Sequence, residues 1–110
     1  MLDAARRAVE LAEGKSVARM EASDETALAL ARLLEILGEA AGRVTQDLRE
    51  SYPEIPWRDI ADTRNRVIHE DFDVDMEIVE AIITNDLPPL TGRLEAVLEE
   101  IDAASGHERE

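Results

Sequence analysis

Residues 24–50 decide the fold, with the sequence DETALALARLLEILGEAAGRVTQDLRE. Leucines and alanines recur in it at spacings of three and four residues, which is the repeat of one face of an α-helix. Ser23 and Asp24 stand at its start, and both residue types favour the N-cap position of a helix. The pattern therefore predicts one long helix from Asp24 to about Glu50, roughly 40 Å in length at 1.5 Å per residue.

Two glycines, Gly38 and Gly42, lie four residues apart within this predicted helix. One interpretation is that they let a second helix approach closely, and the other is that an alanine-rich helix simply tolerates them. The helix is long for so small a domain, and its apolar face is broad. We therefore expect part of that face to pack against a second chain.

Shorter helices are predicted on both sides of the long one. The first covers residues 2–13 and ends at Gly14, after which a turn and a short helical piece are expected. Residues 52–56 contain two prolines and are predicted to end the long helix. A third helix then begins near Pro56, which suits a first helical turn, and ends near His69.

The last part of the chain is also predicted to be helical. Asp73 or Asp75 caps a fourth helix, Asn85-Asp86 interrupts it, and Pro88 suits the start of a fifth. The polar residues 105–110 are predicted to form a disordered tail. The expected fold is thus an all-α bundle of four to five helices within one domain, residues 1–104.

Composition and charge limit the possible functions. The 110 residues carry a net charge of −14 and include no cysteine, which excludes disulfides, thiolate metal sites and cysteine nucleophiles. Such acidity argues against general affinity for nucleic acid, because polyanions repel, so RNA would have to bind at a local basic spot. The acidity also suits a basic protein partner, or serves solubility alone.

The apolar pattern gives an expected location. No apolar run in the sequence approaches the length of a membrane span, and no charged-then-apolar signal peptide opens the chain. We therefore expect a cytoplasmic protein that does not associate with a membrane.

The third predicted helix contains an arginine at an unusual place. Arg64 falls in the middle of an apolar stripe that includes Ile60 and Val67, with His69 five residues further on. A charge in a buried stripe is costly unless something pairs with it. Phosphate chemistry is one explanation, and an ion pair with Asp62 or with an acid on a neighbouring helix is the other.

Cleavage of RNA without a metal needs the two groups that Arg64 and His69 would supply. A base must take the proton from the 2′-hydroxyl, and histidine titrates near neutral pH. A cation must hold the charge that develops on the phosphate oxygens, and the arginine fork matches phosphate geometry. Asn65 would add a hydrogen-bond donor, and Arg66 further positive charge. A histidine near a helix end is also a common surface or capping residue.

The spacing alone does not bring these two groups together. On a straight helix they point about 140° apart, at 100° per residue. They meet only if the arginine reaches around, if the helix ends near His69, or if the partner group comes from a second subunit.

A cluster of acidic residues follows His69. Glu70, Asp71, Asp73 and Asp75 resemble a metal-binding cluster, but helix capping also explains them. Their order lacks the Asp-x-Asp-x-Asp-Gly pattern of a calcium loop. No metal site and no cofactor are therefore predicted.

Several of these stretches together resemble a known family. Residues 34–41 (LEILGEAA), 52–57 (YPEIPW) and 64–69 (RNRVIH), and the segment from Val74-Asp75 to Asp86-Leu87-Pro88, are similar to signatures of HepT-like proteins. These proteins belong to the HEPN superfamily of ribonucleases. The order and spacing of the motifs match over residues 24–101.

The resemblance implies an all-α HEPN-type bundle that forms a homodimer, with a composite cleft at the dimer interface. It maps Arg64 and His69 to the ribonuclease residues, and Asn65 to the polar residue after the arginine. Members of the family often act as toxins of toxin–antitoxin pairs. Their usual partner is a minimal nucleotidyltransferase, which neutralises the toxin by transferring AMP to a tyrosine of the motif.

The chain departs from the family pattern at that tyrosine. Asp71 occupies its position, so the hydroxyl that would accept AMP is absent. A carboxylate there also places negative charge near the scissile phosphate. Two hypotheses follow: the protein is controlled by tight binding of its partner instead of modification, or it has lost nuclease activity and persists as a dimeric interaction module.

Overall fold

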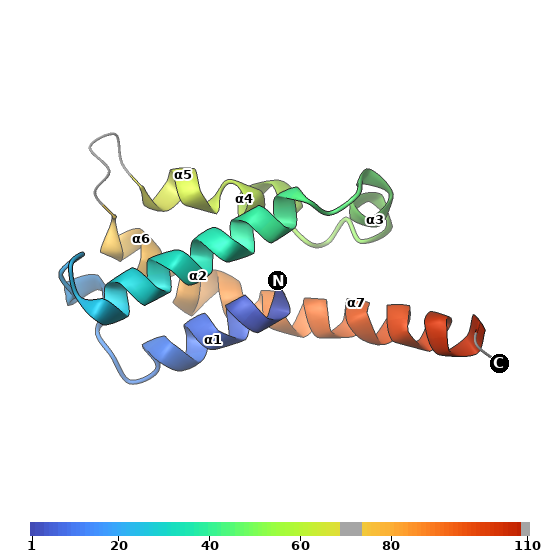
Figure 1. The fold of residues 1–110 in the computed structure, drawn as a ribbon, viewed down its shortest axis with the longest axis horizontal. Helices are drawn as coiled ribbons and strands as arrows, with labels where there is room; N and C mark the ends of the chain where they lie inside the picture. Colours follow the sequence, from blue (N-terminus) through green and yellow to red (C-terminus); the bar gives the residue numbers. More distant parts are fainter. Residues whose placement is uncertain (69–73, 109–110) are drawn as a thin grey trace.

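The computed structural model describes residues 1–68 and 74–108, with side chains described as far as residue 103, and this part of the chain contains helices and no strand. The all-α prediction is confirmed. The elements in chain order are α1 (Leu2–Ala12), η1 (Val17–Arg19), α2 (Glu25–Gly42), α3 (Gln46–Ser51), α4 (Trp57–Ala61), α5 (Thr63–Val67), α6 (Met76–Ala81), η2 (Ile82–Asp86) and α7 (Leu87–Glu108) (Figure 1).

The long predicted helix is in fact two helices, so the prediction of one helix to Glu50 is wrong. Asp24 caps α2 as predicted, with its carboxylate accepting a hydrogen bond from the Thr26 amide. The helix ends at Gly42, and Thr45 caps α3 by accepting a hydrogen bond from the Leu48 amide at 3.2 Å. A threonine hydroxyl that bonds a nearby amide competes with helix continuation, which accounts for the break.

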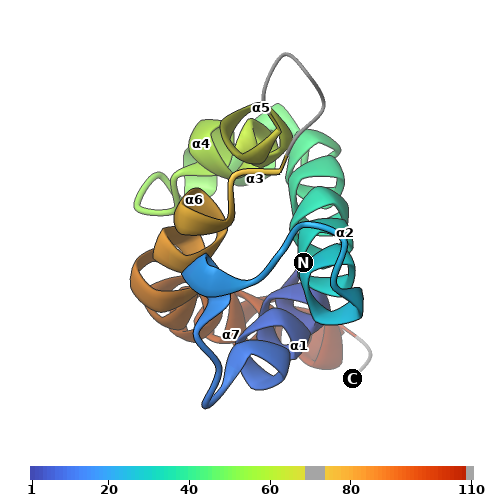
Figure 2. The ribbon, with the colours of Figure 1, turned by 90° about the vertical axis from the view of Figure 1, so that its left-hand side faces the viewer.

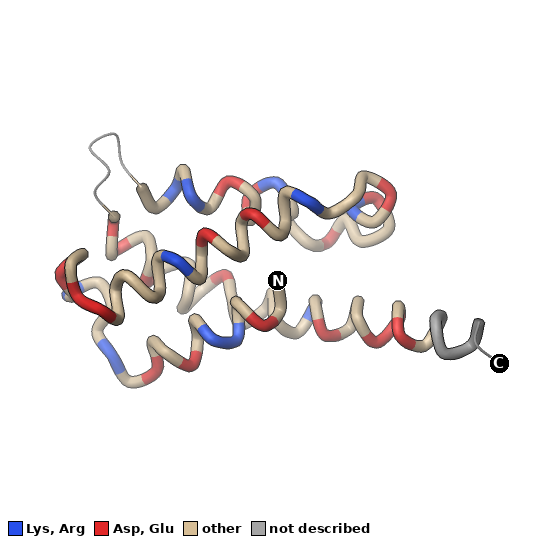
Figure 3. The backbone as a smooth tube through the Cα atoms, in the orientation of Figure 1, with Lys and Arg blue, Asp and Glu red and all other residues tan. Residues whose placement is uncertain are grey.

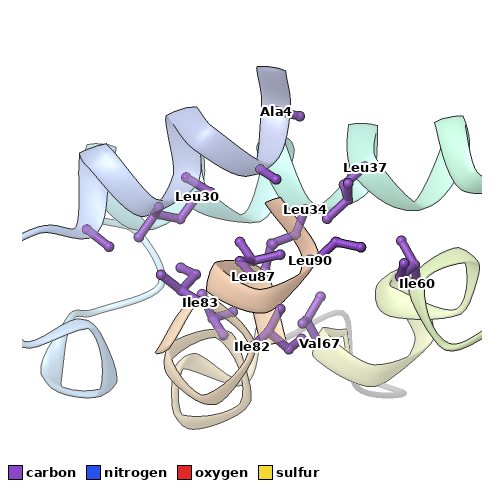
Figure 4. Close-up of a cluster of buried hydrophobic side chains, with 14 of the residues drawn as sticks. Ala4, Leu30, Leu34, Leu37, Ile60, Val67, Ile82, Ile83, Leu87 and Leu90 are labelled. Atoms are coloured by element: carbon purple, nitrogen blue, oxygen red, sulfur yellow. The ribbon is translucent and has the colours of Figure 1, made fainter. Parts of the chain in front are cut away.

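The core lies between α2 and the helices around it (Figure 2). The inner face of α2 buries Leu30, Leu34 and Leu37, which are at most 1% exposed. Opposite them, the buried residues of α1 are all alanines, so the two helices can approach closely. In Figure 4, Leu30 and Leu34 lie on the side of Ile83 and Leu87 from the C-terminal half of the chain, and Leu37 lies on the side of Leu90. Truncation of any of the three leucines to alanine would cost about 2–5 kcal/mol.

The two glycines of α2 have different surroundings. A Cβ on Gly38 would lie 3.1 Å from the Ile60 carbonyl oxygen and 3.4 Å from that of Ala61, whereas a Cβ on Gly42 would meet nothing within 4 Å. Gly38 therefore does let a second helix approach closely, because the end of α4 crosses α2 at this residue. Within this chain, Gly42 is a tolerated helix residue.

This difference predicts opposite effects on stability. Gly38→Val should lower the free energy of unfolding by about 1–3 kcal/mol, because its side chain must displace the backbone of α4. Gly42→Ala should raise the free energy of unfolding by about 0.5–1 kcal/mol, because alanine favours the helix more than glycine does. Denaturant unfolding at one fixed protein concentration measures both. A Gly38→Val protein as stable as the wild type would show that α4 does not press on α2.

The predicted interruption at Asn85-Asp86 is a wide turn within a continuous helical path. Asp75 caps α6 as expected, accepting hydrogen bonds from the amides of Glu77 and Ile78. The segment η2 is a π-helix, and it leads directly into α7. Pro88 and Pro89 follow it, and prolines lack the amide that an α-helix needs from them, so the wider turn accommodates both residues.

The C-terminal half of α7 extends beyond the rest of the bundle, as Figure 1 shows, and the molecule measures 52 × 29 × 19 Å. The Tyr52 hydroxyl donates a hydrogen bond to Glu100 at 2.8 Å, and the Arg93 guanidinium donates one to the Glu54 carbonyl oxygen at 3.1 Å. Residues 109–110 lie outside the described residues. The disorder predicted for 105–110 stays a prediction.

Candidate active site

A break between α4 and α5 decides which side chain of this region is buried. Asp62 separates the two short helices, with backbone angles φ −86° and ψ 4°. After it, Thr63 takes the inner position at 2% exposure, and its hydroxyl donates a hydrogen bond to the Ile60 carbonyl oxygen at 2.6 Å. The prediction that Arg64 lies in the middle of the apolar stripe is therefore wrong, because it assumed one continuous helix.

Arg64 instead points outward from α5 toward α2. Its side chain is 66% exposed, and its Nε lies 3.6 Å from the carboxylate of Glu35. Of the two ion-pair alternatives considered from the sequence, the acid on a neighbouring helix is the one that the structure shows. Glu35 also lies 3.5 Å from the Arg32 guanidinium. An exposed pair of this kind contributes at most about 1 kcal/mol to stability, so a phosphate can compete for Arg64.

Glu35 is a residue of this site that sequence reasoning missed. It belongs to the stretch 34–41, whereas Arg64 begins the stretch 64–69, and their contact joins the two. A signal was present in the sequence, because a glutamate flanked by Leu34 and Ile36 stands next to the core stripe of α2.

The two predicted supporting residues have other partners. The Asn65 amide donates a hydrogen bond to the Asp62 carboxylate at 2.6 Å. Arg66 lies 3.3 Å from Asp86, at the end of η2. Arg64 and Arg66 thus contact opposite neighbours, α2 and η2, and their supporting roles stay predictions.

The position at which α5 ends decides whether Arg64 can meet its predicted partner, His69. The helix ends at Val67, and Ile68 is extended, with φ −106° and ψ 122°. Ile68 pairs with Val74 in an isolated antiparallel bridge, and the Asp75 amide donates to the Val67 carbonyl oxygen at 2.7 Å. The condition that the helix ends near His69 is therefore met, and the angle of a straight helix does not apply.

Residues 69–73 lie outside the described residues, and they include His69, Asp71 and most of the acidic cluster. The catalytic role of His69 and the consequence of Asp71 stay predictions. Of the cluster, only Asp75 is described, and it caps α6. Within the described ranges, no three His, Cys, Asp or Glu side chains are placed to hold a metal ion.

The distribution of charge singles out α5. Figure 3 shows acidic and basic positions mixed along α1 and α2 and mostly acidic ones along α7, while the charged positions of α5 are basic. These are Arg64 and Arg66, and the first turn of α5 contains no acid. In a chain with a net charge of −14, this short helix is a local basic spot of the kind that RNA binding requires.

Tyr52, the chain's single tyrosine, lies at α3, away from α5 along the molecule (Figure 1). Its hydrogen bond to Glu100, followed by slight burial and the charges of Glu100 and Glu54, raises the pKa of its hydroxyl above the usual 10.0. The bond favours the neutral phenol. Any stability it adds is therefore present below pH 10 and is lost as the pH rises through the raised pKa.

Glu100→Ala should lower the pKa of Tyr52 toward the 10.0 of a free tyrosine, because the hydrogen bond to Glu100 is the largest cause of its rise. Glu99→Ala, at the neighbouring exposed position of α7, should leave the raised value unchanged. Ultraviolet absorbance of tyrosinate during an alkaline titration reports on this one residue. An unshifted midpoint in the wild type would show that α7 does not dock on α3 through this bond.

The fold and the site together describe a small helical domain that presents an exposed cation where a short helix ends. Comparison with protein families agrees with that description. Residues 1–97 match the family described as Ribonuclease HepT-like. The chain therefore belongs to the HepT-like ribonuclease family.

Curated relatives support the same assignment. The chain is 39% identical over 71 residues to a "probable ribonuclease HepT" of Thermococcus cleftensis, a match that covers 64% of each chain. It is 36% identical over 69 residues to a candidate RNase of Methanocaldococcus jannaschii, covering 63% of each. The matches thus span slightly less than two thirds of the relatives' length. No solved structure matches the chain.

Among the described residues, none of the helices combines the length and the apolar character that a membrane span requires.

Proposed function

We propose that this protein is a metal-independent endoribonuclease that acts as a homodimer and needs no cofactor. The observation that carries the proposal is Arg64, an exposed cation on a basic helix that ends at Val67, two residues before His69. Membership of a ribonuclease family supports RNA as the substrate. The site of action proposed is the cytoplasm.

The proposed reaction uses the two groups in different roles. His69 takes the proton of the 2′-hydroxyl, and the 2′-oxygen attacks phosphorus. The bond from phosphorus to the 5′-oxygen breaks, and that oxygen takes a proton from water or from the protonated histidine, which leaves a 2′,3′-cyclic phosphate. Arg64 stabilises the charge on the non-bridging oxygens as it develops. To do so, its guanidinium exchanges the Glu35 carboxylate for the phosphate.

The outer face of α2 supports the homodimer. Ala29 and Ile36 are exposed there and Leu33 is half-buried, so an apolar stripe remains uncovered in the single chain. A groove of about 580 Å³ between α1 and α2 includes Ala29 and Leu33 and adjoins this stripe. At 100° per residue, Arg32 lies between Ile36 and Glu35 on α2. Dimerisation through the stripe would therefore bring Arg32 and the neighbouring Arg64 to the edge of the interface.

We further propose that the protein is the toxin of a toxin–antitoxin pair, with a minimal nucleotidyltransferase as its antitoxin. Because Asp71 replaces the tyrosine that would accept AMP, tight binding of the partner is the proposed means of control. Co-purification of the two proteins without AMP transfer is the expected result. Transfer of AMP to this chain would contradict control by binding.

A cleavage assay in the presence of EDTA tests the nuclease. RNA should be cut at the same rate with EDTA as with magnesium, and the products should carry cyclic phosphate ends. Cleavage that requires magnesium would refute a mechanism based on Arg64 and His69.

The alternative is a dimeric interaction module that binds the nucleotidyltransferase without cutting RNA. Two carboxylates favour it. Glu35 forms an ion pair with Arg64, and Asp71 is found where the family motif has tyrosine. It predicts a stable complex and no cleavage at any protein concentration. Substituting Asp71→Tyr would then restore cleavage or AMP acceptance if the loss is recent.

A further inference from the structure

A cavity of about 480 Å³ lies on the side of α5 opposite to Glu35. Its volume falls within the range of roughly 300–1,000 Å³ that is typical of small-molecule sites. It is bounded by α2, α4, α5, η2 and the start of α7. Residues from the stretches 52–57 and 86–88, to which the proposed nuclease reaction gives no role, line it together with Arg66.

The floor of the cavity is apolar. Figure 4 shows Leu90 of α7 pointing toward Ile60 of α4, with Leu37 of α2 beside them. These three side chains are at most 7% exposed, and each lines the cavity. A flat apolar or aromatic ring can rest on such a floor, since burial of its faces is favourable.

The rim is polar, and two exposed groups on it have no partner among the residues that the structure describes. Arg66 is paired with Asp86, and Arg93 donates a hydrogen bond to the Glu54 carbonyl oxygen. By contrast, neither the Asp59 carboxylate nor the Asn85 amide forms a hydrogen bond or ion pair with any residue that the structure describes. The π-helix η2 places Asn85 on this rim, and π-turns are frequent at functional sites.

We propose that this cavity is a subsite for one unpaired base of the RNA, with guanine preferred; the proposal rests on the nuclease function proposed above. Arg66 at the rim and Arg64 on the far side belong to the same short helix, whose width is about 10–12 Å. A single strand that crosses α5 would therefore pass both. Proteins bind unstacked RNA bases by packing their faces and by hydrogen bonding to their edges.

The preference for guanine follows from the free groups on the rim. A carboxylate only accepts hydrogen bonds, through two oxygens, and guanine offers its N1–H and its amino group side by side. The Asn85 amide can donate to the guanine O6. Uracil has a single N–H between two carbonyl oxygens, which a carboxylate repels. A phosphate is a poor ligand here, because Asp59 and Asp86 both lie on the rim.

Titration of isotope-labelled protein with guanosine, followed by NMR, tests the proposal without any need for cleavage. Saturable shifts are expected at the amides of Thr63 and Asn85, and uridine should bind at least about fivefold more weakly. Asp59→Asn keeps the shape of the side chain and should weaken guanosine binding at least about fivefold. Asp47→Asn, at an exposed position on α3, is the matched control and should change nothing.

Two further arms separate this proposal from the nuclease. Arg64→Ala should bind guanosine as the wild type does, although it cuts RNA poorly. Mapping of cut sites should show a guanine preference that Asp59→Asn removes while cleavage persists. The subsite would be overturned by equal binding of guanosine and uridine, or by the absence of saturable binding. It would also be overturned if Asp59→Asn bound guanosine as tightly as the wild type. Guanosine binding by a protein that never cuts RNA would refute the nuclease alone.

Discussion

Arg64→Ala is expected to slow RNA cleavage by about 100- to 1,000-fold, the usual cost of losing one donor to a developing oxyanion. The melting temperature should hardly change, because the side chain is exposed and its ion pair with Glu35, at 3.6 Å, is weak. Arg64→Lys should recover only part of the rate, since an ammonium lacks the two-pronged geometry of a guanidinium. Quenched-flow or gel-based cleavage at saturating RNA measures the effect on the chemical step.

Two variants serve as controls for Arg64. Arg43→Ala removes another exposed arginine, at the end of α2, and should cut RNA at the wild-type rate. His69→Ala should reduce cleavage by about 100- to 10,000-fold, as expected for loss of a general base. Undiminished cleavage by Arg64→Ala would remove the arginine from the mechanism, whatever the result for His69.

Ile36→Glu is expected to convert the dimer to monomers. The side chain is 38% exposed in the single chain, so glutamate fits the folded monomer, but the proposed interface would bury it. A two-fold interface would contain the new charge twice, and burial of an unpaired charge is costly. A penalty of about 3 kcal/mol would already weaken association more than 100-fold. Light scattering after size-exclusion chromatography gives the mass directly.

Cleavage should fall together with the dimer, because the proposed cleft is shared between subunits. Leu98→Glu is the matched control, since Leu98 is 45% exposed on α7 and lies outside the α2 stripe. It should leave both mass and cleavage unchanged. An Ile36→Glu protein that remains a dimer would move the interface elsewhere, and a fully active monomer would refute the composite cleft.

The helical periodicity was sufficient to predict the fold class but not the places where helices break. The core stripe of α2 at Leu30, Leu34 and Leu37 follows directly from its spacing. The break before α3 depends on a hydroxyl of Thr45 that bonds a nearby amide, and this is a local competition that apolar spacing does not register. A threonine three residues before Leu48 was nevertheless a visible capping signal.

The site was predicted less completely than the fold, for a similar reason. A continuous helix from Trp57 would bury position 64, whereas the turn at Asp62 makes Thr63 the inner residue and turns Arg64 to the surface. The buried Thr63 satisfies its own hydroxyl by a bond to the preceding turn, so it needs no distant partner. The contact between Arg64 and Glu35 depends on tertiary packing, which no one-dimensional pattern encodes.

The alanine face of α1 limits how this sequence can diverge. Ala4, Ala5, Ala8 and Ala12 are each at most 8% exposed, and any larger side chain at these positions would push α1 away from the bundle. The N-terminal helix takes no part in the proposed chemistry, yet four of its eleven positions admit little beyond a methyl group. Among natural variants of this protein, we therefore expect substitutions in α1 to be confined to its solvent side, and small residues to persist on the side that faces α2.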